Sequence, residues 1–145
     1  MSPSLGVITL LHPAYFFWLQ EVINGSYYFS KEAKIIEQSQ KNDQKYIIFS
    51  GKNVLNKAVN LLDNIKNIQS SKLNNIEQAF YINERRWDIK FSNELLLLLS
   101  EKNIQTSLNN YIKLLNQLNE SDVLLIKSID LRNNDKAIIN FKKND

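Results

Sequence analysis

Residues 83–100, NERRWDIKFSNELLLLLS, decide which fold the chain adopts. Trp87, Ile89 and Phe91 alternate with charged residues. Alternation with a period of two places the three apolar side chains on one face of a β-strand and the charged ones on the other. The first half of this stretch therefore predicts a strand that buries one of its two faces.

Five consecutive leucines, Leu95–Leu99, follow a predicted tight turn at Ser92 and Asn93. Leucine favours helices, but five residues between a turn and Ser100 are too few for a stable helix. The stretch therefore predicts a β-hairpin rather than a leucine-rich helix. Because all five residues of this second strand are apolar, both of its faces must be at least partly covered. We expect the hairpin to be central, with one helix packed on it.

Length and composition bound the class of protein. A chain of 145 residues with 43% hydrophobic residues can bury roughly 70% of its unfolded surface, which is enough for one core. The net charge of +3 is spread along the chain, and it neither requires nor excludes an anionic partner. The absence of cysteine excludes disulfides, thiolate metal sites and a cysteine nucleophile.

The apolar opening, Leu5–Leu19, has to be weighed as a membrane or targeting segment. It lacks a basic leader, is interrupted by His12 and Pro13, and is shorter than the about 20 helical residues that cross a bilayer. We interpret it as strand material from the core. The chain as given is expected to be soluble, and a membrane anchor would have to lie upstream of Met1.

Periodicity predicts an α+β fold: a mainly antiparallel sheet with two amphipathic helices packed on it and a C-terminal edge strand. The helices are expected at Val54–Ile68, capped by Asn53, and at Ile104–Leu118, capped by Asn103. Besides the hairpin, the predicted strands are Leu5–Leu11, Tyr15–Leu19, Tyr27–Phe29, Ala33–Glu37, Tyr46–Phe49, Ile76–Ile82, Val123–Leu131 and Ala137–Phe141. Asn24-Gly25 suits the turn between two of them.

Arg85 and Arg86 beside Trp87 admit two interpretations. They could form a small nucleic-acid-binding module, with phosphate contacts from the arginines and base stacking on the tryptophan. Glu84 and Asp88 flank them, however, and nucleic-acid binding normally needs several phosphate contacts. We favour arginines that pair with carboxylates at the start of a strand, and keep the nucleic-acid module as the alternative.

Catalytic patterns are weak in this sequence. His12 is the only histidine, which removes most triads and metal sites. Ser50-Gly51-Lys52-Asn53 lacks the upstream glycine and the Ser or Thr of a phosphate-binding loop. We predict no catalytic, cofactor-binding or metal-binding residue, and no enzymatic activity.

Three motifs together resemble a known family. R-R-W-D-I-K-F, followed by a leucine strand, a helix and I-D-L-R, resembles the C-terminal part of the bacterial cell-division family FtsQ/DivIB. P-A-Y-F-F-W is similar to that family's P-x-A-x-W segment, and Y-I-I-F-S-G-K-N-V-L-N-K-A to its strand, glycine and helix start. The resemblance runs from about Leu5 to Phe141.

The resemblance implies a non-enzymatic scaffold on the periplasmic side of the bacterial inner membrane. Residues 1–11 would be a remnant of the last strand of a POTRA domain, and residues 12–145 an FtsQ-like β domain. The implied partners are the coiled-coil division proteins FtsB and FtsL, with no nucleic acid and no cofactor. Carried onto this sequence, the partner-binding residues are Arg132, Asn133, Lys136, Ala137, Ile138, Ile139, Asn140 and Phe141.

Overall fold

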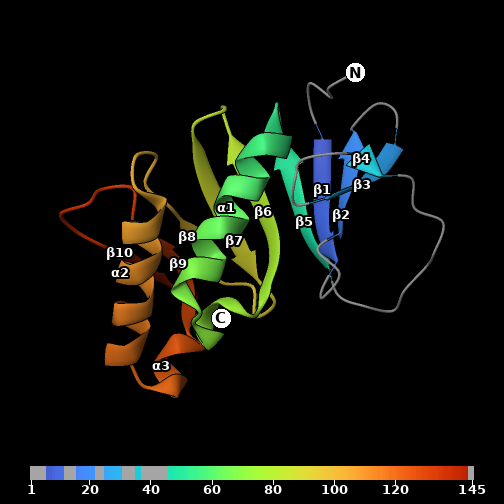
Figure 1. Ribbon diagram of the computed structural model, residues 1–145. Helices are drawn as coiled ribbons and strands as arrows, with labels where there is room; N and C mark the ends of the chain where they lie inside the picture. Colours follow the sequence, from blue (N-terminus) through green and yellow to red (C-terminus); the bar gives the residue numbers. More distant parts are fainter. Residues whose placement is uncertain (1–5, 12–15, 22–24, 31–34, 37–45, 144–145) are drawn as a thin grey trace.

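The fold is α+β, as the sequence predicts, and is built on one mixed sheet (Figure 1). The computed structural model describes residues 6–11, 16–21, 25–30, 35–36 and 46–143, with side chains from residue 47 onward. The described strands run in the order β10-β9-β8-β7-β6-β5-β1-β2-β3-β4 across the sheet. Their bounds are β1 Gly6–Leu11, β2 Phe16–Glu21, β3 Gly25–Ser30, β4 Ile35–Ile36, β5 Tyr46–Gly51, β6 Ile76–Ile82, β7 Arg86–Phe91, β8 Leu96–Leu98, β9 Ile126–Asp130 and β10 Ile138–Phe141.

The first four strands confirm the predicted N-terminal strands with small shifts of their ends. β1 pairs antiparallel with both β2 and β5, which places it inside the sheet. β2 and β3 form an antiparallel pair in which Glu21 faces Gly25, while Asn24 of the predicted turn lies outside the described residues. The apolar opening of the chain therefore contributes strands to the sheet.

The described sheet is mainly antiparallel, as the sequence predicts, but two of its strand pairs are parallel. β5 pairs in parallel with β6, and β8 with β9, while the other described pairs are antiparallel. A parallel pair needs a crossover connection, and here each crossover contains one of the two long helices. The sheet is mixed because these helices separate strands that end up as neighbours.

Helix α1 (Val54–Ile68) has the bounds that the apolar periodicity predicts. Val54, Ala58 and Leu61 form its buried face. The predicted cap by Asn53 is wrong, because this residue adopts a left-handed conformation with φ of 55° and its side chain caps no amide. The Asn53 side chain instead donates a hydrogen bond of 3.0 Å to Oε2 of Glu84.

Helix α2 (Ile104–Gln117) begins at the predicted cap, since Oδ1 of Asn103 accepts a hydrogen bond of 3.2 Å from the Thr106 amide. Leu108, Tyr111 and Leu115 face the core, and the Tyr111 ring stacks on Phe91 at 5.3 Å. A third helix, α3 (Glu120–Val123), ends at the first residue of the predicted strand Val123–Leu131, and a turn follows it. That strand, β9, starts only at Ile126.

Both long helices cover the same face of the sheet (Figure 1). A line of residues across the strands identifies this face. Each residue in the line is the pairing partner of the next, and all of those in β5 to β9 are buried. The line consists of Phe49, Ala79, Ile89, Leu97 and Ile129, and ends at the half-buried Ile139 of β10. The leucine strand therefore lies inside the sheet, as predicted, and the two long helices lie on one side of it.

The opposite face of the sheet carries the side chains that alternate with the buried ones. Leu96 and Leu98 are half-buried there, whereas Leu95, Leu97 and Leu99 are fully buried under the helices. We expected both faces of this strand to be at least partly covered. The face away from the helices is covered less, and charged residues of β7 and β9 share it with the two leucines.

Candidate functional site

Strand β10 lies at one end of the described sheet and is hydrogen-bonded to β9 alone. Ile138 pairs with Asp130, and Ile139 with Ile129. The backbone N–H and C=O groups on the other side of an edge strand have no strand partner, which makes them a template for a further strand. The predicted C-terminal edge strand is therefore present, and it begins at Ile138, one residue later than expected.

The side chains of β10 divide between the two faces of the sheet. Ile139 lies on the helix side, whereas the Asn140 side chain reaches Oγ of Ser128 on the other side with a hydrogen bond of 3.0 Å. The pairing register shifts between Asn140 and Phe141. Ile138 is 46% exposed and Phe141 is 54% exposed, so the edge presents two large apolar side chains to its surroundings.

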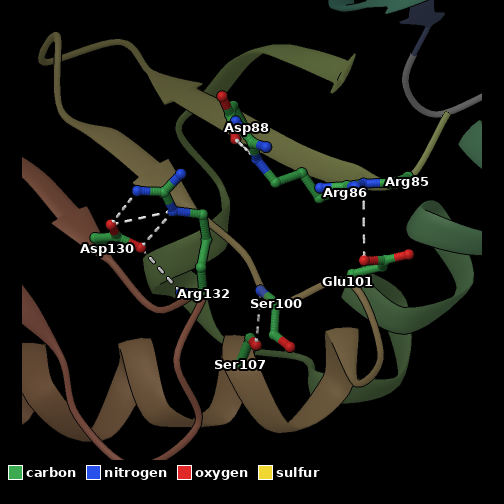
Figure 2. A network of polar contacts seen from close by, with 8 residues as sticks. All are labelled: Arg85, Arg86, Asp88, Ser100, Glu101, Ser107, Asp130 and Arg132. Atoms are coloured by element: carbon green, nitrogen blue, oxygen red, sulfur yellow. Dashed lines mark hydrogen bonds and ion pairs between the residues drawn. The ribbon is translucent and has the colours of Figure 1, made fainter. Parts of the chain in front are cut away.

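Arg132 is held by Asp130 two residues before it (Figure 2). The guanidinium donates 2.9 Å from Nε to Oδ1 and 2.6 Å from Nη2 to Oδ2, and the Arg132 amide donates to Oδ1 at 3.0 Å. These hydrogen bonds lower the pKa of Asp130 below its usual range. Asp130 was absent from the predicted site, although the spacing in I-D-L-R could have pointed to it.

After the buried Leu131, residues 132–136 of the loop between β9 and β10 are polar and exposed. Oδ1 of Asn133 accepts a hydrogen bond of 2.8 Å from the Asp135 amide, which closes a tight local turn. Lys136 and Ala137 are exposed and precede the strand. The predicted site residues therefore do not form one continuous surface. Arg132 and strand β10 lie on either side of a loop that is held by a hydrogen bond within itself.

A second ion pair lies on the same face as Asp130. Arg86 Nε is 3.5 Å from Oδ1 of Asp88, and neither atom has a hydrogen-bond partner within the described part of the chain. Burial raises the pKa of Asp88, and nearby Arg86 only partly offsets this effect. Leu98 is the pairing partner of both Asp88 and Asp130, so one apolar residue separates the two pairs.

The two neighbouring arginines point in different directions (Figure 2). Arg86 reaches Asp88, whereas Nε of Arg85 lies 3.8 Å from Oε2 of Glu101. The expected pairing with carboxylates is confirmed, although Arg85 uses Glu101 rather than the adjacent acid. That acid, Glu84, lies 3.6 Å from the Lys52 ammonium.

Trp87 is a core residue and not a stacking platform. Its side chain is 2% exposed and lies against Phe49 and Tyr81, with ring centroids 6.0 and 4.9 Å away. Base stacking requires an accessible ring face, which Trp87 lacks. The nucleic-acid alternative therefore loses its aromatic group.

His12, the only histidine, lies outside the described residues. Among the described residues no group of three or more His, Cys, Asp or Glu side chains is arranged to hold a metal ion. Over the same residues, each helix is too short or too polar to cross a bilayer.

Comparison with known families adds an independent observation to this geometry. The family model for the cell division protein FtsQ/DivIB, C-terminal, matches residues 17–132. The match contains both R-R-W-D and I-D-L-R and ends at Arg132, so β10 follows it. No curated protein matched the chain. The matched residues make up most of the chain, and it belongs to the FtsQ/DivIB cell-division family, through that family's C-terminal domain.

Proposed function

We propose that the chain is a non-enzymatic division scaffold that recruits coiled-coil proteins of the FtsB and FtsL type. The partner adds a strand to β10, and the complex couples assembly of the division machinery to septal peptidoglycan synthesis. The observation that carries this proposal is the position of β10, which pairs with β9 alone at the end of the described sheet. Strand addition at such an edge is a recurrent mode of peptide recognition.

The energetics of a four-residue edge strand suit a reversible contact. Each backbone hydrogen bond to a partner contributes about 0.5 to 1.5 kcal/mol net. Ordering the partner segment offsets part of this gain. The exposed side chains of Ile138 and Phe141 add apolar area that a partner strand can cover.

Charge near the edge favours an acidic partner. Lys127, Lys136 and Lys142 are exposed on or beside β9 and β10, and Arg132 is 49% exposed on its side chain. A partner carboxylate that approaches Arg132 competes with Asp130 for the guanidinium. The edge therefore selects a strand that carries acidic residues, and Asp130 limits how strongly Arg132 takes part.

We place this domain on the periplasmic side of the bacterial inner membrane, as the family's cell-division role suggests. Within the chain, residues 1–11 stand as the proposed remnant of a preceding POTRA domain, and residues 12–145 as the β domain. In the sheet, β1 from the first of these segments pairs with β2 and β5 from the second.

The test uses two variants that act by different means. Ile139→Pro removes a backbone N–H and fixes φ in the middle of β10, and Arg132→Glu places a negative charge where an acidic partner approaches. Lys113→Glu on the exposed face of α2 is the matched charge control. Binding of an FtsB-like segment is measured by calorimetry, with circular dichroism as the folding control.

We expect both variants to remain folded and to bind weakly, while the Lys113→Glu control binds like the wild type. Arg132 lies outside the core, and Ile139 is only half-buried at the edge of it, which is why folding should survive. Wild-type affinity in both folded variants, and in a truncation that ends before Lys136, would exclude β10 as the binding edge.

A further inference from the structure

A cleft with a volume of about 400 Å³ opens on the helix side of the molecule. One wall is α1, with Lys57, Asn60 and Asn64. The opposite wall is the turn between β6 and β7, with Arg85, and the segment that leads into α2, with Lys102. None of the lining residues belongs to β9 or β10, so this cleft is separate from the proposed partner edge.

Positive charge predominates in the cleft. Lys57, Arg85, Arg86 and Lys102 line it, whereas Glu101 is its only acidic lining residue. Two of the four cations are already engaged, because Arg85 lies 3.8 Å from Glu101 and Arg86 lies 3.5 Å from Asp88. Within residues 46–143, Lys57 and Lys102 form no ion pair, so two ammonium groups remain for a bound anion.

Neutral amides supply the other polar contacts. Asn60 and Asn64 from α1 and Gln105 from α2 line the cleft, and an amide side chain can both donate to and accept from a peptide group. The Asn64 side chain already donates to the backbone oxygen of Asn60 at 2.9 Å and keeps its own oxygen as an acceptor. The one lining tryptophan, Trp87, is buried in the core, and no exposed aromatic ring lines the cleft. The lining therefore suits a chain of peptide groups and carboxylates better than a base or a sugar.

We propose that this cleft binds a short peptide that carries several carboxylates. A volume of about 400 Å³ falls in the range of small-ligand sites and accommodates a few residues. Each exposed ion pair contributes little by itself, so a single carboxylate would bind weakly and several are needed. The amides of the walls hold the peptide backbone between the cations.

The probe is triglutamate, titrated into the full chain and followed by amide chemical shifts in NMR. Triglutamine has the same length without charge, and inorganic phosphate supplies charge without a peptide. We expect shifts in residues 57–64 and 100–105 with triglutamate, and weaker binding of both other probes. The double variant Lys57→Gln, Lys102→Gln should weaken triglutamate binding about tenfold, because two charge-assisted contacts are lost.

The control is Lys113→Gln, which removes one exposed positive charge from α2 outside the cleft. Both lysines of the double variant are exposed, so the fold should persist, and the NMR spectrum itself reports it. Equal binding of triglutamine, equal binding of phosphate, or a double variant that matches the Lys113→Gln control would each overturn the proposal. These variants leave strand β10 unchanged. Binding of an FtsB-like segment to β10 can therefore be measured independently of triglutamate binding in the cleft.

Discussion

Arg132 binds the carboxylate of Asp130 with three side-chain hydrogen bonds, of 2.9 and 3.1 Å from Nε and 2.6 Å from Nη2. The two residues are two positions apart at the end of β9, immediately beside the edge strand β10. A charge that is already neutralised within the chain attracts a partner less than a free one does. Asp130 therefore acts as an internal competitor for any acidic partner of Arg132.

Asp130→Asn should strengthen binding of an acidic FtsB-like segment several-fold, because the guanidinium loses its charged internal acceptor. Calorimetry at low salt measures the change, and the gain should shrink as salt is added. Asp122→Asn, which removes one exposed acidic charge on α3, is the control for net charge alone. An equal gain in both variants would show that Asp130 does not compete for Arg132.

Acid should act on Asp88 and Asp130 in opposite senses. Arg132 lowers the pKa of Asp130, so its contribution to stability is present above the unfolded pKa and is lost as the pH falls through the lower folded value. Burial raises the pKa of Asp88, so its charge disfavours the folded state until the pH falls through the raised value. A carboxyl-carbon NMR titration should find Asp130 protonated at a lower pH than Asp88. The reverse order would contradict this assignment.

Trp87→Ala should lower the free energy of unfolding by about 3 to 5 kcal/mol, because it opens a cavity between Phe49 and Tyr81. Chemical denaturation followed by circular dichroism gives this value. Leu124→Ala removes a side chain that is 63% exposed and should change stability by less than about 0.5 kcal/mol. A Trp87→Ala protein as stable as the Leu124→Ala control would contradict the core role of the tryptophan.

Glu94→Gly should raise the free energy of unfolding by about 0.5 kcal/mol. Glu94 ends the turn between β7 and β8 with φ of 73°, a conformation that costs about 1 to 2 kcal/mol for a residue with a side chain and that glycine adopts freely. The greater freedom of glycine in the unfolded chain and loss of the exposed pair with Lys90, at 3.3 Å, offset part of the gain. Thermal unfolding compares this variant with Glu94→Ala, which keeps the strain and should show no gain.

Local pattern was sufficient to predict the elements that bury one face. Helix α1 and strand β6 have the bounds that the periodicity predicts. Trp87 is buried, as the alternation requires. The family resemblance was likewise visible in short motifs, and the family model confirms it over residues 17–132.

Relationships between distant residues could not be predicted in the same way. Asn53 is a good capping residue by type, but Glu84, which lies 31 positions later, accepts a hydrogen bond from its side chain. The parallel pairing of β5 with β6 and of β8 with β9 depends on where α1 and α2 pack. The periodicity of the sequence does not indicate where a helix packs. Even the contact between Asp130 and Arg132, two residues apart, could not be predicted, because it depends on how the chain turns after β9.

The two parallel strand pairs also govern the order in which this sheet can assemble. The hairpins that join β6, β7 and β8 need only short turns, whereas pairing β8 with β9 requires residues 99–125 to close as one loop around α2. Loop closure costs entropy before the pairing repays it, so distant strands join more slowly than hairpins do. β9 should therefore dock late, and β10, which pairs with β9 alone among the described strands, should dock later still. The edge offered to a partner should then open at a lower free energy than the β6, β7 and β8 hairpins, and a bound strand would slow that opening.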